Sequence, residues 1–83
     1  MDEASITSEQ CRAARALLAW SQDDLSVKAR ISKTTLALFE IGERNPYART
    51  LAALRRSLER AGVVFIDQNG GGPGVRLKRK AKR

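Results

Sequence analysis

The spacing of two serines sets the strongest limit on how the middle of this chain folds. Ser21 and Ser32 each precede a helix-forming stretch, and a serine hydroxyl is a favoured N-cap because it accepts a hydrogen bond from a free amide of the first turn. The two caps predict short helices over residues 22–29 and 33–41. Only the three residues from Arg30 to Ser32 separate these helices, so they form a pair joined by a tight turn.

Longer helices are predicted on either side of this pair. Thr7 and Gln10 fit a capping box at the start of a helix over residues 8–19. A fourth helix is predicted over residues 48–61, after a loop marked by Asn45-Pro46. Apolar residues recur at helical spacing and predict one shared core, made of Cys11, Ala14, Leu18, Leu25, Ala29, Leu36, Phe39, Leu51, Leu54, Leu58 and Ala61.

The hydrophobic period changes after Gly62. Residues 63–66 are β-branched or aromatic and residues 75–78 alternate, with a glycine-rich stretch between them. This pattern predicts a short two-stranded hairpin within residues 63–77. An isolated hairpin is only marginally stable in water, so it must pack on the last helix or pair with a second copy of the chain through its outer edge.

Composition excludes most catalytic and metal-binding chemistry. The chain has 83 residues, enough for one domain, with no histidine and one cysteine. This removes the ordinary metal sites and nucleophile–base pairs, and Cys11 is expected to be a small buried apolar residue. Gly70 to Gly72 follow a strand but no helix opens after them, so a phosphate-binding loop is not expected. We expect neither an enzyme nor a bound cofactor or metal.

Positive charge is concentrated in the middle and at the end of the chain. The 16 basic and 9 acidic residues give a net charge of +7; residues 76–83 hold six of the basic ones, and residues 28–60 carry eight basic against three acidic. This distribution favours a polyanionic partner, and the tail over residues 78–83 is expected to be disordered. No apolar run approaches the roughly 20 residues of a membrane span, and the first residues lack the layout of a secretory signal. We therefore expect a cytoplasmic protein without membrane contact.

A string of residues in the first part of the chain resembles a known family. It comprises Arg15, Trp20-Ser21-Gln22, Leu25, Ile31-Ser32, Thr35-Leu36, Phe39-Glu40, Gly42, Pro46, Thr50-Leu51 and Leu54. On these residues, the segment from Arg15 to Leu58 resembles the lambda-repressor-like, or Cro/Xre-type, helix-turn-helix DNA-binding family. The resemblance implies a mainly α, compact four-helix domain over residues 1–62, extended by the hairpin at 63–77 and the basic tail at 78–83.

The resemblance also implies which residues meet DNA. In this family the second helix of the pair enters the major groove, and the neighbouring helix start and loop meet phosphates. Carried over to this chain, the DNA-binding residues are Gln22, Arg30, Ser32, Lys33, Thr34, Ala37, Leu38, Arg44, Asn45 and Tyr47. Lys33 is expected to donate to guanine, and Thr34 to reach a base or a phosphate. Arg15 and Glu40 resemble the family's interhelical ion pair, the alternative being two unrelated surface charges.

Three positions depart from the family's pattern. Arg30 stands where the family usually has glycine, so it must adopt a positive φ, at a cost of about 1 kcal/mol, or shift the turn. Leu38 and Ile41 stand where polar or basic residues are usual. Leu38 is expected either to touch a thymine methyl group or to pack against protein.

Two functions fit this sequence. The first is a nucleoid-associated homodimer that regulates transcription by binding double-stranded DNA sequence-specifically, with recognition helices in successive major grooves about 34 Å apart. The basic tail would then add salt-dependent affinity for any DNA. The alternative is a protein-interaction module, such as an antitoxin that holds a toxin through its apolar recognition face or its hairpin. Leu38 and Ile41 discriminate between the two.

Overall fold

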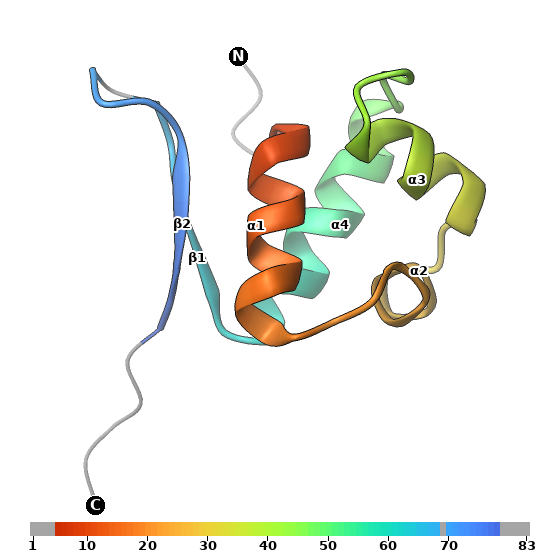
Figure 1. Ribbon diagram of the computed structural model, residues 1–83, viewed down its shortest axis with the longest axis horizontal. Coiled ribbons are helices and arrows are strands. Elements are labelled where there is room, and N and C mark those ends of the chain that lie inside the picture. Colours follow the sequence, from red (N-terminus) through yellow and green to blue (C-terminus); the bar gives the residue numbers. More distant parts are fainter. Residues whose placement is uncertain (1–4, 69, 79–83) are drawn as a thin grey trace, which may run out of the picture.

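The computed structural model describes residues 5–68 and 70–78, which form four helices followed by a two-stranded hairpin (Figure 1). The helices are α1 (Ser8–Leu18), α2 (Gln22–Ala29), α3 (Lys33–Glu40) and α4 (Ala48–Arg60), and the strands are β1 (Val63–Ile66) and β2 (Gly74–Leu77). The mainly α, four-helix architecture with a C-terminal hairpin is confirmed. Of the predicted basic tail, only Lys78 lies within the described residues.

The predicted helix limits are correct at the starts and one residue too long at three of the ends. The sequence places Ala19, Ile41 and Ala61 inside helices, whereas they are the C-cap residues of α1, α3 and α4. Ala19 has φ 57° and ψ 37°, a left-handed conformation that cannot continue a helix. Strand β2 is one residue earlier than predicted because Gly74 pairs with Ile66. In the described part of the chain, no helix is long and apolar enough to cross a membrane.

Side-chain caps begin three of the helices, as the sequence predicted. Thr7 accepts from the Gln10 amide at 3.0 Å, and Gln10 Oε1 accepts from the Thr7 amide at 2.9 Å. Ser21 and Asp24 make the same reciprocal box at the start of α2, at 3.0 and 2.9 Å. Ser32 accepts from the third amide of α3 at 3.0 Å. These bonds satisfy amides that have no partner inside the helix, and so fix where each helix begins.

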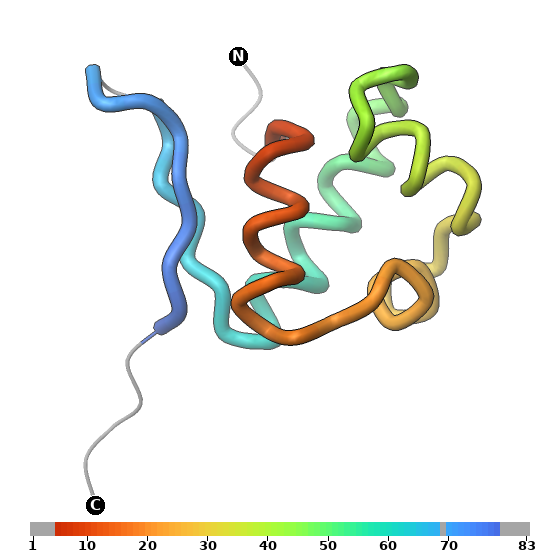
Figure 2. The backbone as a smooth tube through the Cα atoms, viewed as in Figure 1, coloured from red at the N-terminus to blue at the C-terminus, as the bar shows by residue number. Residues whose placement is uncertain are grey.

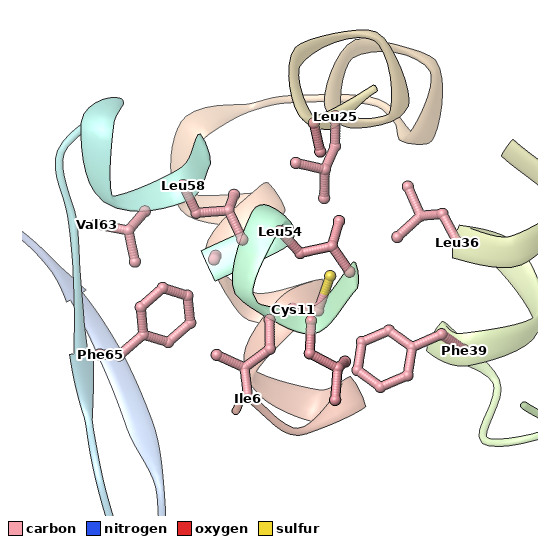
Figure 3. Close-up of a cluster of buried hydrophobic side chains, with 12 residues drawn as sticks. Ile6, Cys11, Leu25, Leu36, Phe39, Leu54, Leu58, Val63 and Phe65 are labelled. Carbon is pink, nitrogen blue, oxygen red and sulfur yellow. The ribbon is translucent and has the colours of Figure 1, made fainter. Parts of the chain in front are cut away.

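Side chains from all four helices and from β1 meet in one core (Figure 3). Leu25, Leu36, Leu54 and Leu58 are fully buried at its centre. The core residues predicted from helical spacing are buried, except that Leu18 is partly buried against the cluster and Ala61, the C-cap of α4, is exposed. Because α2 and α3 each contribute to this core, the short pair is held against α1 and α4 rather than by its own turn alone.

The hairpin packs on α1 and α4, on the side of the molecule away from α3 (Figure 1 and Figure 2). Val63 and Phe65 of β1 are buried in the core. Gln10, itself buried on α1, donates from Nε2 to the carbonyls of Ile66 at 3.2 Å and Gly74 at 3.1 Å. Ile66 and Gly74 are paired across the hairpin, so one side chain holds the same end of both strands.

Candidate nucleic-acid interface

The turn between α2 and α3 is closed by backbone hydrogen bonds around one left-handed residue. Arg30 has φ 60° and ψ 46°, so the strained alternative considered for it is the one adopted. The Ile31 amide donates to Ser26 at 3.1 Å, and the Arg30 amide donates to Val27 at 3.3 Å. Ser32 then caps α3 directly. The connection between α2 and α3 is therefore a tight, hydrogen-bonded turn.

The outer face of α3 carries the residues assigned to base contact. Leu36, Phe39 and Glu40 are buried, which directs the opposite side of the helix to solvent. This outer face consists of Lys33, Thr34, Ala37, Leu38 and Ile41. Lys33 and Thr34 are exposed in the first turn, Ala37 and Leu38 are partly exposed, and Ile41 is 69% exposed at the far end. The outer face is therefore polar at the start of α3 and apolar at its end.

The loop after α3 lies beside this face. Gly42 follows the C-cap Ile41 and takes φ 81°, a left-handed conformation that ends α3. Arg44 then turns back, and its Nη1 donates to Thr35 Oγ1 at 3.4 Å. Asn45 and Tyr47 are exposed on the same loop. Together with Pro46 and Thr50, these residues line a shallow groove of about 380 Å³ next to α3. Arg44, Asn45 and Tyr47, which were predicted to lie along the DNA backbone, are therefore gathered beside Thr35 in the first turn of α3.

A buried ion pair ties α1 to α3. Arg15 donates from Nε and Nη2 to the two carboxylate oxygens of Glu40, each at 2.7 Å. The Glu40 side chain is 1% exposed and that of Arg15 is 19% exposed. A third guanidinium nitrogen of Arg15 donates to the Trp20 carbonyl at 3.0 Å, and Arg12 donates to the backbone carbonyl of Glu40. The predicted pairing of Arg15 with Glu40 is present in the structure, and it orients α3 on α1.

Two further donors complete the shell around Glu40. Gln22 Nε2 donates to Glu40 Oε1 at 2.9 Å and Cys11 Sγ donates to Glu40 Oε2 at 3.2 Å. Burial raises the pKa of Glu40, but the bonds from Arg15, Gln22 and Cys11 lower it more, and the pKa lies below its ordinary value. Burial, followed by the Glu40 carboxylate, raises the pKa of the Cys11 thiol, which therefore stays protonated.

Sequence reasoning missed parts of this network. Cys11 is buried as expected, but its thiol is a donor rather than a passive apolar group. Gln22, assigned to phosphate, uses its side-chain amide inside the protein to join α2 to α3. One signal was available for Cys11, because it stands four residues before Arg15 and so shares a face of α1. No local pattern marked Gln22 as a partner of Glu40.

An exposed ion pair crosses the turn on the outer side. Lys33 Nζ lies 3.1 Å from Asp23 Oδ1, with the two side chains 56% and 71% exposed. Lys33 was singled out from the sequence for base contact, but Asp23 was not. The structure brings the two side chains together because α2 and α3 pack against each other.

The helices α2 and α3 are short and joined by a tight turn, and the first turn of α3 is polar and faces solvent. This arrangement defines a helix-turn-helix unit, a class of DNA-binding element. Residues 12–61, more than half of the chain, match the family model described as helix-turn-helix, of Cro/C1 type. The chain belongs to this lambda-repressor-like family of DNA-binding regulators. A search of curated proteins finds no match.

Proposed function

We propose that the protein is a sequence-specific regulator of transcription that inserts α3 into the major groove of double-stranded DNA. The observation that carries this proposal is the solvent-facing first turn of α3, held by the buried Glu40 network and flanked by the loop residues Arg44 and Asn45. A short helix anchored on its inner side and bare on its outer side fits a major groove about 12 Å wide. Base edges are then read by Lys33 and Thr34, the residues nearest the start of α3.

The residues around α3 are proposed to hold phosphates. The N-terminus of α2 offers backbone amides at Gln22, and a helix N-terminus is a natural anion site. The other proposed contacts are all exposed in the structure: they are Arg30, Ser32, Arg44, Asn45 and Tyr47. Such contacts set the register of the protein on DNA, and the sequence is read by the α3 face, including Ala37 and Leu38.

A homodimer through the hairpin is also proposed. The Lys78 amide donates to the Gly62 carbonyl at 2.6 Å, so these two residues face each other as a hydrogen-bonded pair. In an antiparallel ladder, hydrogen-bonded pairs alternate with pairs that are not hydrogen-bonded to each other. Val75 and Leu77 therefore direct their backbone N–H and C=O groups away from β1, and no other described strand pairs with β2. Leu77 is 45% exposed. Pairing of β2 with its copy would satisfy these edge groups and cover apolar surface.

The dimer is tested by a substitution that removes only an outward amide. Leu77→Pro deletes an N–H that β1 does not use, and proline is tolerated at such an edge position. We expect Leu77→Pro to be monomeric by sedimentation and Leu77→Ala, which keeps the amide, to remain dimeric. A dimer that survives Leu77→Pro would refute pairing through β2.

DNA recognition is tested by selection of bound duplexes from a random pool at physiological salt. We expect an inverted repeat whose half-sites lie one helical turn, or a whole number of turns, apart. Lys33→Ala should reduce the preference for one base at a defined base pair, whereas Lys28→Ala, which removes the same charge from beside Trp20, should not.

Removal of residues 78–83 should weaken binding to all sequences equally and flatten the salt dependence of binding.

Protein binding is the second candidate, and one observation favours it. Ile41 leaves 69% of its surface exposed at the end of the recognition face, where a basic residue would suit phosphate better. An antitoxin-like protein would use this apolar end of α3, with Leu38, to hold its partner. Ile41→Arg is expected to strengthen DNA binding whichever function is correct, so DNA binding does not separate the two. Loss of binding to a protein partner in Ile41→Arg is the result that would support the second function.

A further inference from the structure

The ion pair between Asp23 and Lys33 places a carboxylate on the face that meets DNA. An exposed pair of this kind adds little to stability. A negative charge beside the recognition helix also opposes binding of phosphates in general. Asp23 suits the positive end of the α2 dipole, but so does Asp24, and that role needs no contact with Lys33. A role in discrimination accounts for the pairing of Asp23 with Lys33 on this face.

The geometry of the pair sets how far Asp23 reaches. Its Oδ1 lies 3.1 Å from Lys33 Nζ, so the pair presents an acceptor and a donor side by side. The major-groove edge of a G·C pair presents the acceptors N7 and O6 on guanine and the donor N4 on cytosine. O6 and N4 are hydrogen-bonded to each other and so lie about 2.9 Å apart. The spacing of the side-chain donor and acceptor matches the spacing of this acceptor and donor.

We propose that Asp23 and Lys33 read one G·C base pair together. Lys33 donates to guanine N7 and O6, and Asp23 accepts from cytosine N4. This proposal rests on the proposed function, because it requires α3 in the major groove. When A·T replaces G·C in the same orientation, the adenine N6 donor faces Lys33 and the thymine O4 acceptor faces Asp23. The N7 acceptor is kept, but the contacts at the O6 and N4 positions both become repulsive, so Asp23 is a specificity-determining residue.

The test is selection from a random duplex pool with matched variants. Asp23→Ala removes the acceptor, and Asp67→Ala removes an equally exposed carboxylate on the hairpin side, 3.5 Å from Arg55. In Asp23→Ala, preference for G·C should fall about ten-fold at one base pair, the one at which Lys33→Ala also loses preference. Other positions should keep their preferences, and binding to unrelated DNA should strengthen a few-fold, by about the effect of one charge. Asp67→Ala should leave the profile unchanged.

A second variant separates the charge from the hydrogen bond. Asp23→Asn removes the charge but keeps an acceptor oxygen, so it should share the stronger general binding of Asp23→Ala and lose less of the G·C preference. An unchanged profile in Asp23→Ala, or an equal loss at all positions, would overturn the proposal while the proposed function stands. If the unsubstituted protein selects no sequence, the proposed function fails first.

Discussion

Removal of Arg15 tests how the recognition helix is held. Arg15→Met leaves the Glu40 carboxylate, 1% exposed, with only the neutral donors Gln22 and Cys11. Breaking a buried pair from one side costs about 3–5 kcal/mol. Protonation of Glu40 limits this cost, because neutralising a carboxyl of pKa about 4.3 at pH 7 requires roughly 3.7 kcal/mol. We therefore expect a loss of about 3–4 kcal/mol.

That loss is large for a chain of this size. A stability of about 0.05–0.15 kcal/mol per residue gives roughly 4–12 kcal/mol for the whole protein. The double variant Arg15→Met/Glu40→Met should be more stable than Arg15→Met alone, because no buried charge is left unpaired. Urea unfolding followed by circular dichroism measures all three proteins, with Arg56→Met, an exposed change on α4, as the control.

The pH dependence should reverse in sign. In the unsubstituted protein the pKa of Glu40 is lowered, so its contribution is present above pH of about 4.3 and is lost as pH falls through the folded-state value. In Arg15→Met, burial without a counter-charge raises that pKa, and stability should fall as pH rises from about 5 to 7. A loss below about 1 kcal/mol at pH 7, or stability that rises over this range, would refute the reasoning.

Three further substitutions or reactions probe the rest of the structure. The Cys11 thiol, buried and with a raised pKa, should react with a disulfide reagent only as fast as the protein unfolds; rapid labelling under native conditions would contradict its burial. Arg30→Gly should raise stability by about 1 kcal/mol, since glycine adopts φ 60° without strain, and should weaken DNA binding if the guanidinium meets phosphate. Gln10→Ala should release the hairpin, seen as faster amide exchange in β1 and β2, whereas exposed Gln68→Ala should not; equal protection in both would argue against the clamp.

Much of the fold could be predicted because its signals are local. A cap such as Thr7, Ser21 or Ser32 acts within three residues, and helical periodicity repeats within two turns. The caps placed three helix starts and the tight turn, and the Asn45-Pro46 loop placed the start of α4. These signals failed by one residue at three helix ends, because C-cap residues such as Ala19 and Ile41 are half inside the helix and periodicity does not separate them from it.

The sequence by itself determined the elements, their order and the outer face of α3. Only the tertiary structure decided which side chains meet across them. Gln10 reaches Gly74 over 64 positions, and Gln22 meets Glu40 over 18, so no periodic pattern connects them. Lys33 was found from its place in α3, yet its pairing with Asp23 depends on how two helices cross. Such contacts follow from packing and rotamers in three dimensions, and these are set by the whole core rather than by neighbours in the chain.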